Sequence, residues 1–476
     1  MAVSLSLLAG GCGCSSPLTT PPPLASELSY FPTRSPFVAT VATYPRGAAV
    51  QNVEALLGAF PLAKLAISAL ESTLSSAGVN YQRDVEPLYG NPIVLSALRL
   101  SSASSLRGST FLAVRITKSA AKLAALVKGI HGLTAGGTVD GATLYRAGPA
   151  ALAVDGATAV LGSSPAEVSA ALNRHAHGGG LTAADYAKAM GSLPRNTLAQ
   201  AFGSVAGAVS SSQAHRIPWV AAIRGYAVSL SATSTGITAQ LRLDTSGAPL
   251  TTSELPITPG SAAPLLAGTL PIAVGVRDPA RTIAFIEAAL RSVDPAAYAR
   301  FIRREIASRR KTGYDLNAFV GMLTGNLIVE SDTRTTMVRA DVSNRASAAR
   351  QLARFPELAR YIFPTAKSVT RQPGGFYGVK EARGKSFELG LVGSEFVAGM
   401  ATPAQLRAFA TAPATPVPNA QGSVAFRISL LELLQLGLGK PPNPLLAPIL
   451  TGLSDITGSV SATPSALSGQ LGLGVK

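Results

Sequence analysis

Short landmarks in the first half of this 476-residue chain return, in the same order, in its second half. The offset between the two members of a pair stays between 230 and 238 residues. Three of these pairs are Leu88-Tyr89-Gly90-Asn91 with Leu323-Thr324-Gly325-Asn326, Ser164-Pro165-Ala166-Glu167 with Thr402-Pro403-Ala404-Gln405, and Ala239-Gln240-Leu241 with Gly469-Gln470-Leu471. Because matches in a fixed order at nearly one offset are improbable by chance, they indicate a duplicated domain.

The duplication predicts two copies of one fold, repeat 1 at 29–250 and repeat 2 at 265–476. A linker at 251–264, rich in Pro, Ser and Thr, would join them. With 47% hydrophobic and only 14% charged residues, the chain can fill two cores, and general disorder is excluded.

Each copy mixes strand and helix signals. Residues 38–43 alternate as a strand does, residues 62–74 have helical spacing, and Gly78 would end that helix. Asp155-Gly156 suggests a type I′ hairpin turn, and Ser164-Pro165 and Thr402-Pro403 resemble helix starts. We therefore predict an α+β fold of two tandem repeats, each a mainly antiparallel sheet with helices packed on one face.

The amino terminus resembles a bacterial export signal. The two cysteines of the chain, Cys12 and Cys14, follow the apolar run 2–9 and two small residues. This pattern predicts a signal peptide at 1–11, a lipidated Cys12, and a Ser/Pro-rich tether at 12–28. The chain contains no run of 18 apolar residues, so no transmembrane helix is predicted. The lipid would therefore hold the protein on the outer face of the bacterial cytoplasmic membrane. The alternative is an ordinary apolar terminus with two idle thiols.

The order of these features resembles a family of bacterial cell-envelope lipoproteins catalogued as a domain of unknown function. The resemblance rests on the leader cysteine, the stretch 31–36, and the block Gly78-Val79-Asn80 with Asp84, Leu88, Gly90 and Asn91. The family pattern has an acid where this chain has Asn80, and a glutamate where it has Pro92 and Leu327. The resemblance implies the architecture and an envelope location, and it implies no activity or cofactor.

Motifs with catalytic chemistry are weak. Ser119-Ala120-Ala121-Lys122 and Lys311-Thr312-Gly313 match two motifs of penicillin-binding proteins, which leaves an envelope serine hydrolase using Ser119 and Lys122 as one alternative. Ser-x-x-Lys, however, arises easily by chance, and Lys311-Thr312-Gly313 ends a predicted helix instead of occupying a strand. His175-x-His177 has no nearby acid or cysteine to complete a metal site. We therefore predict no enzyme activity, no metal site and no cofactor.

A basic amphipathic helix is predicted to begin after Asp294 and to end at Gly313. At 100° per residue, Tyr298, Phe301, Ile302 and Ile306 share one side, whereas the basic residues Arg300, Arg303, Arg304, Arg310 and Lys311 share the other. Residues 271–420 carry 21 Lys and Arg against 12 acids, a net +9 of the +16 on the whole chain. Such a face could bind an anionic lipid or cell-wall polymer, or could simply be a solvated surface.

Three classes of function stay open on the sequence. The first is a non-catalytic, lipid-anchored binding or structural protein of the bacterial envelope. The second is a carrier of lipid or glycolipid, which would need an apolar cavity, and the third is the serine hydrolase. Nucleic acid is not an expected partner despite the high positive charge, because export separates the protein from it and aromatic residues do not interleave the basic run.

Overall fold

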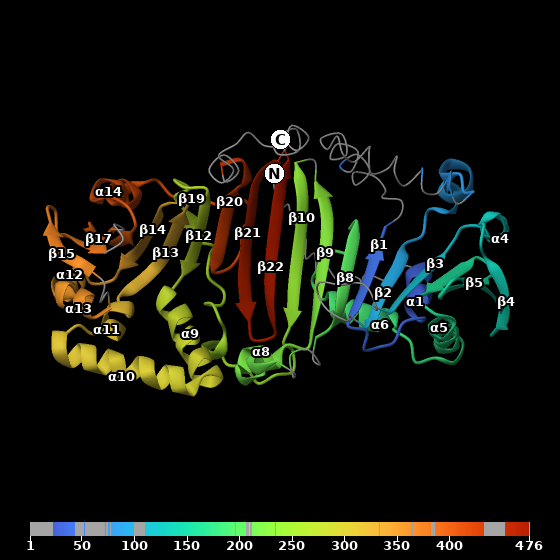
Figure 1. Cartoon of the computed structure of the whole chain (residues 1–476), viewed down its shortest axis with the longest axis horizontal. Helices are drawn as coiled ribbons and strands as arrows, with labels where there is room; N and C mark the ends of the chain where they lie inside the picture. The colour runs from blue at the N-terminus through green and yellow to red at the C-terminus, as the bar shows by residue number, and fades with distance from the viewer. Residues whose placement is uncertain are drawn as a thin grey trace, which may run out of the picture.

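The computed structural model shows a mixed α+β fold built on a large antiparallel sheet, which confirms the predicted class (Figure 1). It describes residues 22–42, 78–99, 110–195, 197–205, 212–233, 235–332, 334–362, 366–381, 386–432 and 453–475, with the single residues 52, 72, 75, 76 and 209. Except for residue 72, the helix predicted at 62–74 lies outside this described part.

Ten strands of the first half pair side by side, all antiparallel. Their spatial order is β4-β5-β6-β7-β3-β2-β1-β8-β9-β10. The strands are β1 (Phe37–Val41), β2 (Ile93–Arg99), β3 (Thr110–Ile116), β4 (Thr134–Val139), β5 (Ala142–Ala147), β6 (Ala150–Asp155), β7 (Thr158–Gly162), β8 (Ala199–Ser204), β9 (Gly225–Thr233) and β10 (Gly236–Asp244).

The second half follows the same order. Its strands pair as β15-β16-β17-β18-β14-β13-β12-β20-β21-β22, so each strand has neighbours equivalent to those of its counterpart. They are β12 (Ile272–Arg277), β13 (Leu323–Ser331), β14 (Thr336–Val342), β15 (Ala366–Gln372), β16 (Phe376–Glu381), β17 (Ser386–Val392), β18 (Glu395–Gly399), β20 (Val424–Ser429), β21 (Leu453–Thr463) and β22 (Ala466–Val475), and a separate pair joins β11 (Leu265–Leu266) to β19 (Thr415–Pro416). This order is the one that a duplication predicts, although the superposition of 29–250 on 265–476 stays a prediction.

The two halves meet edge to edge in the middle of the sheet, where β10 pairs with β22 (Figure 1). Gln240 lies opposite Gln470, its own counterpart at the offset of 230 residues. At the two ends of this pairing, Gly236 lies opposite Gly474 and Asp244 lies opposite Ala466. The offset of 230 residues relates each of these pairs to the other. The joint is therefore self-complementary, as the interface of a twofold-symmetric dimer is.

Helices lie on both faces of the outer strands, which differs from the predicted single covered face. In the first half Leu144 and Ala153 belong to the core under α5, whereas their neighbours Tyr145 and Leu152 belong to the cluster under α4. Because successive residues of a strand point to opposite faces, strands that are apolar at successive positions need a cover on each face. The helical segments are α1 (Pro22–Leu28), η1 (Tyr81–Val85), η2 (Glu86–Leu88), α4 (Ala120–Gly129), α5 (Pro165–His177), α6 (Ala183–Met190), η3 (Gln213–Arg216), α8 (Pro218–Ala222) and η4 (Thr252–Glu254).

The second half repeats this two-sided packing. Val397 of β18 packs with α14, and the adjacent Ala398 packs with the cluster that includes α12. The helices are α9 (Pro279–Val293), α10 (Pro295–Thr312), α11 (Leu316–Val320), α12 (Arg345–Ala353), α13 (Phe355–Ile362) and α14 (Pro403–Thr411). Across the described residues, no helix is long and apolar enough to span a membrane.

The predicted tether at 12–28 is wrong over its last seven residues. Residues 22–28 form α1, in which Leu24 and Leu28 lie one helical turn apart and are both buried in the first core. Burial of these leucines, together with Tyr30 and Phe31, outweighs the extended preference of the prolines before them. The predicted linker at 251–264 is also packed, because Leu255 and Ile257 are buried beside Ala462.

Candidate functional site

The predicted basic helix exists as α10, and its ends have clear local causes. The Asp294 side chain accepts a hydrogen bond from the Ala297 amide, and Pro295 occupies the first turn, where its missing amide is not needed. Gly313 ends the helix with φ of 67°, a left-handed conformation that favours glycine. These caps define the two ends of the 18-residue helix.

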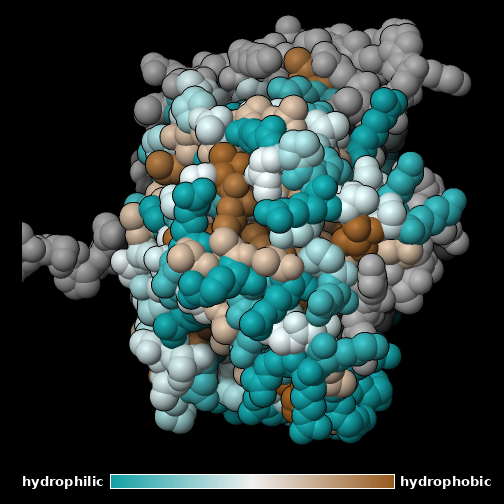
Figure 2. All heavy atoms as spheres, turned by 90° about the vertical axis from the view of Figure 1, so that its left-hand side faces the viewer, coloured by the Kyte–Doolittle hydropathy of each residue, from teal (hydrophilic) through white to brown (hydrophobic). Residues whose placement is uncertain are grey.

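All five predicted basic residues of α10 are exposed: Arg300, Arg303, Arg304, Arg310 and Lys311. The four arginines among them form no ion pair with another described residue. By contrast, the adjacent Arg309 lies 3.4 Å from Asp315. The opposite side of the helix is buried at Ser308 and Thr312. Four positive charges are thus held at one surface without local neutralisation, and Figure 2 shows hydrophilic residues gathered at the lower edge over this helix.

The buried side of α10 is less complete than the sequence predicted. Phe301, expected in the core, is 36% exposed, and the neighbouring α9 exposes Ile286 at 57% and Leu290 at 37%. The surface around the basic helix therefore combines guanidinium groups with large apolar side chains. That combination is typical of protein surfaces that lie against membrane interfaces.

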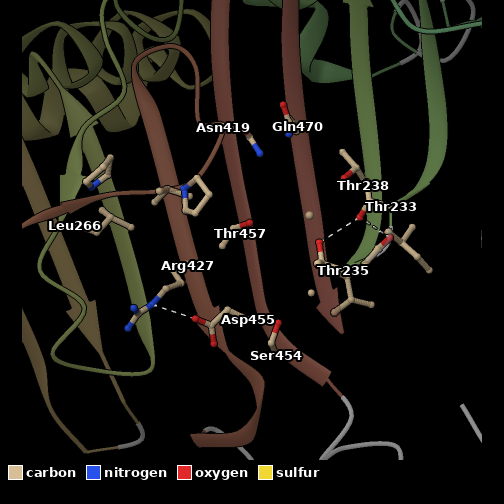
Figure 3. A pocket seen from close by; sticks show the side chains of 18 of the residues that line it. Thr233, Thr235, Thr238, Leu266, Asn419, Arg427, Ser454, Asp455, Thr457 and Gln470 are labelled. Atoms are coloured by element: carbon tan, nitrogen blue, oxygen red, sulfur yellow. Dashed lines mark hydrogen bonds and ion pairs between the residues drawn. The ribbon is translucent and has the colours of Figure 1, made fainter. Parts of the chain in front are cut away.

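A polar groove lies on the central sheet across the joint between the halves, because residues of both β10 and β22 line it. Its volume is about 590 Å³. Figure 3 shows Thr457 and Gln470 on neighbouring strands between Leu266 on one side and Thr238 on the other. Arg427 lies 3.7 Å from Asp455 at its edge. Because hydroxyl and amide groups form much of the lining, the groove is not the apolar cavity that a lipid carrier needs.

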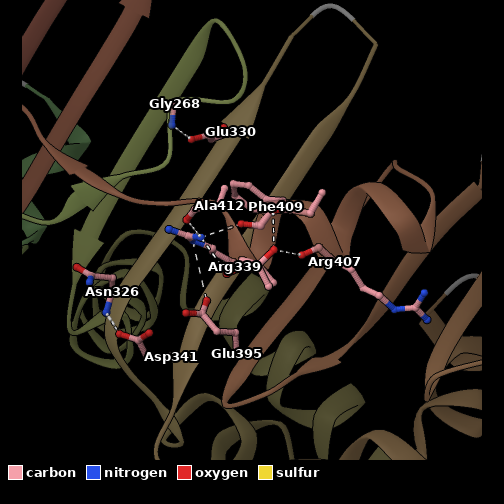
Figure 4. Close-up of polar contacts among 12 residues, drawn as sticks. Gly268, Asn326, Glu330, Arg339, Asp341, Glu395, Arg407, Phe409 and Ala412 are labelled. Atoms are coloured by element: carbon pink, nitrogen blue, oxygen red, sulfur yellow. Dashed lines mark hydrogen bonds and ion pairs between the residues drawn. The ribbon is translucent and has the colours of Figure 1, made fainter.

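A buried arginine organises the polar contacts of the second half (Figure 4). The Arg339 guanidinium donates to the carbonyls of Phe409 at 2.7 Å, Ala410 at 3.1 Å and Ala412 at 3.1 Å, at the end of α14, and lies 4.0 Å from Glu395. Burial raises the pKa of Glu395, while the charge of Arg339 lowers it. The Nη1 group of Arg339 thus donates to the carbonyls at the end of the helix. This arrangement anchors the end of α14 to the sheet.

The serine hydrolase motifs do not come together. Ser119 is the N-cap of α4, where its hydroxyl accepts a hydrogen bond from the Lys122 amide at 3.3 Å, and the Lys122 side chain is exposed. Lys311-Thr312-Gly313 ends α10, and Figure 1 places α10 and α4 toward opposite ends of the molecule. In this fold the Ser-x-x-Lys spacing is a helix cap.

The acidic positions of the family pattern also have local structural roles. Asn80 caps the short helix η1 by accepting from the Arg83 amide, and Asp315 caps α11 by accepting from the Ala318 amide. Since Asn and Asp are equally good caps, either residue serves at this position. Asp84 forms an ion pair with Arg83 at 2.7 Å, and hydrogen bonds from Arg83 and from the Asn80 amide lower its pKa to about 2.

The two histidines of the pair His175-x-His177 have separate local contacts in the structure. The His175 ring stacks on Tyr30 with centroids 4.2 Å apart, and its Nδ1 lies 2.5 Å from the Ser29 hydroxyl. His177 contacts Asn173. Within the described ranges, no three His, Cys, Asp or Glu residues are grouped as metal ligands would be. Cys12, the predicted lipidation site, lies outside those ranges.

The comparisons with known proteins give only a distant structural likeness. No protein-family model and no curated protein matches the chain. Crystal forms III and I of TP0453 are 10% and 9% identical to it, each with a TM-score of 0.28. Each covers 47% of this chain, and the matches span 82% and 81% of the TP0453 chains. A likeness of this degree carries no conclusion about function.

Reasoning from the sequence missed the central groove and the buried Arg339. Both depend on differences between the copies. The 230-residue offset aligns Gly472 in the groove with Arg242, whose larger side chain pairs with Asp244 at 3.6 Å. A position-by-position comparison of the two halves could have singled out such glycine-for-arginine differences.

Proposed function

We propose that this protein is a membrane-anchored, surface-exposed bacterial lipoprotein with a non-catalytic binding or structural role in the envelope. In this proposal Cys12 carries the lipid, and α10 contacts an anionic lipid or cell-wall polymer. An acylated amino-terminal peptide beginning at Cys12, detected by mass spectrometry, would support the anchor. An unprocessed amino terminus on protein from a bacterial membrane fraction would contradict it.

The observation that carries the proposal is the exposed basic face of α10. Arg300, Arg303, Arg304 and Arg310 lie on it without ion pairs to described residues. Each Lys or Arg near an anionic membrane surface contributes on the order of 1 kcal/mol, so four could contribute up to about 4 kcal/mol at low salt. A lipid anchor would already hold the protein near that surface, so weak contacts would be sufficient.

The test compares two variants that lose the same charge. In a soluble form of the body, residues 22–476, we would replace Arg300, Arg303, Arg304 and Arg310 with Gln and measure sedimentation with phosphatidylglycerol vesicles. The control replaces four exposed cations of the first half with Gln: Lys122, Lys128, Arg146 and Lys188.

We expect the α10 variant to lose most vesicle binding and the control to keep most of it. The difference should shrink as the ionic strength rises above about 0.1 M, where the Debye length falls below ~10 Å. Equal losses in both variants would mean that only net charge matters. No loss in either would mean that α10 is a solvated face.

A further inference from the structure

A second pocket lies in the second half, between α12 and the β15–β16 hairpin, with a volume of about 490 Å³. One wall is a single face of α12, because the lining positions 345, 346, 349, 352 and 353 recur at helical spacing. The facing wall consists of Arg371 on β15, the glycine turn after it, Tyr377 on β16 and Leu391 on β17.

The pocket combines an apolar floor with two cations. Leu352 and Tyr377 are 4% and 7% exposed, and both belong to the core of the second half. Arg345 and Arg371 are exposed, and neither guanidinium has a hydrogen bond or ion pair to another described residue. Arg345 is also the first residue of α12, where the helix dipole adds positive potential. Two guanidinium groups free of partners can bind the same oxyanion.

The first half shows what this position looks like without the cations. In the first half, Tyr145 lies opposite Leu152 on one neighbouring strand and opposite Ala135 on the other. In the second half, Tyr377 lies opposite Leu389 and opposite Arg371 in the same way. Ala135 is therefore the counterpart of Arg371. The first residue of α4 after its cap is Ala120, the counterpart of Arg345. The positions of both arginines are therefore occupied by alanines in the first half, whereas the tyrosine is present in both halves.

We propose that this pocket binds a phosphate-bearing amphiphile, with the phosphate between Arg345 and Arg371 and the apolar part against Leu352, Tyr377 and Leu391. The phosphate fits the two cations, and the attached hydrocarbon covers the floor that water would otherwise wet. The pocket and the basic face of α10 share no lining residue, and the proposal does not depend on that face binding a membrane. The ligand is a lipid headgroup or a small phosphate ester, which share this chemistry.

The test is calorimetric titration of the full chain in a buffer free of phosphate. The probes are monomeric dihexanoyl phosphatidic acid, hexyl phosphate, inorganic phosphate and hexanol. We expect at least one of the two organic phosphates to bind at least about tenfold more tightly than inorganic phosphate or hexanol. Binding of the phosphatidic acid alone would identify a lipid headgroup, and binding of both would identify small esters as ligands also.

The variants Arg345→Ala and Arg371→Ala reproduce the alanines of the first half and should each weaken binding of the organic phosphates at least about tenfold. Arg350→Ala is the control, because Arg350 is exposed on the same helix but does not line the pocket. Ala349→Glu places a carboxylate among the lining residues and should abolish binding. Circular dichroism checks that each variant is folded.

Either of two results would overturn the proposal. One is that the organic phosphates bind no better than inorganic phosphate and hexanol. The other is that folded Arg345→Ala and Arg371→Ala proteins bind as tightly as the Arg350→Ala control.

Discussion

Glu27 is the residue whose burial has the clearest measurable consequence. Its side chain is fully buried in α1, and its Oε1 accepts a hydrogen bond from the Ile116 amide at 2.8 Å. Burial raises its pKa from 4.5 to about 8, against the opposing effects of that hydrogen bond and of the Arg115 charge. The fold therefore favours the protonated carboxyl.

This predicts that Glu27 destabilises the protein as the pH rises. Because the folded-state pKa of Glu27 is raised, the stabilising contribution of its protonated carboxyl is fully present below about pH 4.5. This contribution is lost as the pH rises through about 8. Glu27→Gln keeps the acceptor for Ile116 and removes the charge. We expect it to increase the free energy of unfolding by a few kcal/mol at pH 8.5 and by little at pH 5. Urea unfolding at both pH values tests this, and parallel pH profiles of the two proteins would contradict it.

At the scale of the element, the left-handed end of α10 allows a matched comparison of two glycines. Gly313 has φ of 67°, and a Cβ there would lie 2.9 Å from Nη1 of Arg354. Gly129, near the end of α4, has no positive φ, and a Cβ there would meet no atom within 4 Å.

We predict opposite signs for the two alanine substitutions. Gly313→Ala should destabilise the protein by roughly 1–2 kcal/mol, because a side chain is forced into the left-handed region. Gly129→Ala should be neutral or stabilising by up to about 1 kcal/mol, because alanine has less freedom to lose on folding. Urea unfolding of both variants measures the difference. Equal effects would mean that the left-handed cap contributes nothing.

The sequence predicted elements well where one residue type dictates a local conformation. The helix starts at Ser164 and Thr402 and the helix end at Gly313 are confirmed. The expected type I′ turn at Asp155-Gly156 is wrong, because the two-residue loop begins one residue later and only Gly156 has positive φ. Asp140, at φ of 45°, and Gly141, at 83°, form a two-residue hairpin loop in which both φ values are positive. The dipeptide alone does not show which residues are the last of the strand.

Reasoning from the sequence found the basic face of α10 because it depends on the periodicity of one helix. The phosphate pocket was not found because Arg345 and Arg371 lie on different elements, and only the paired sheet brings α12 beside β15. Periodicity predicts which face of an element is polar. It does not predict which other element that face will meet.

At the scale of the whole molecule, the pairing of β10 with β22 makes a sharp prediction about register. Directly opposed residues in an antiparallel pair have Cα atoms about 4.5–5.5 Å apart, which is within reach of a disulfide. Gln240 and Gln470 are such a pair. In a protein with Cys12 and Cys14 replaced by serine, Gln240→Cys with Gln470→Cys should form a disulfide on mild oxidation.

The control replaces Gln240 and Leu471 with cysteine. Leu471 is adjacent to Gln470, so its side chain points to the opposite face of the sheet. Peptide mapping under non-reducing conditions should find the link in the first variant only. Linkage at equal yield in both, or in neither, would contradict the described register.

The pairing of β10 with β22 can form only late in the synthesis of the chain. β22 is the last strand of the sheet in sequence, and it pairs with a strand about 230 residues earlier. Until those last residues emerge, β10 is an edge strand with unpaired backbone groups, which is a template for another chain. Because the pairing of β10 with β22 is self-complementary, the partner that fits this edge best before β22 arrives is β10 of a second unfinished chain. Chains cut short before 466 should therefore associate in pairs through the edge that the 476-residue chain closes within itself.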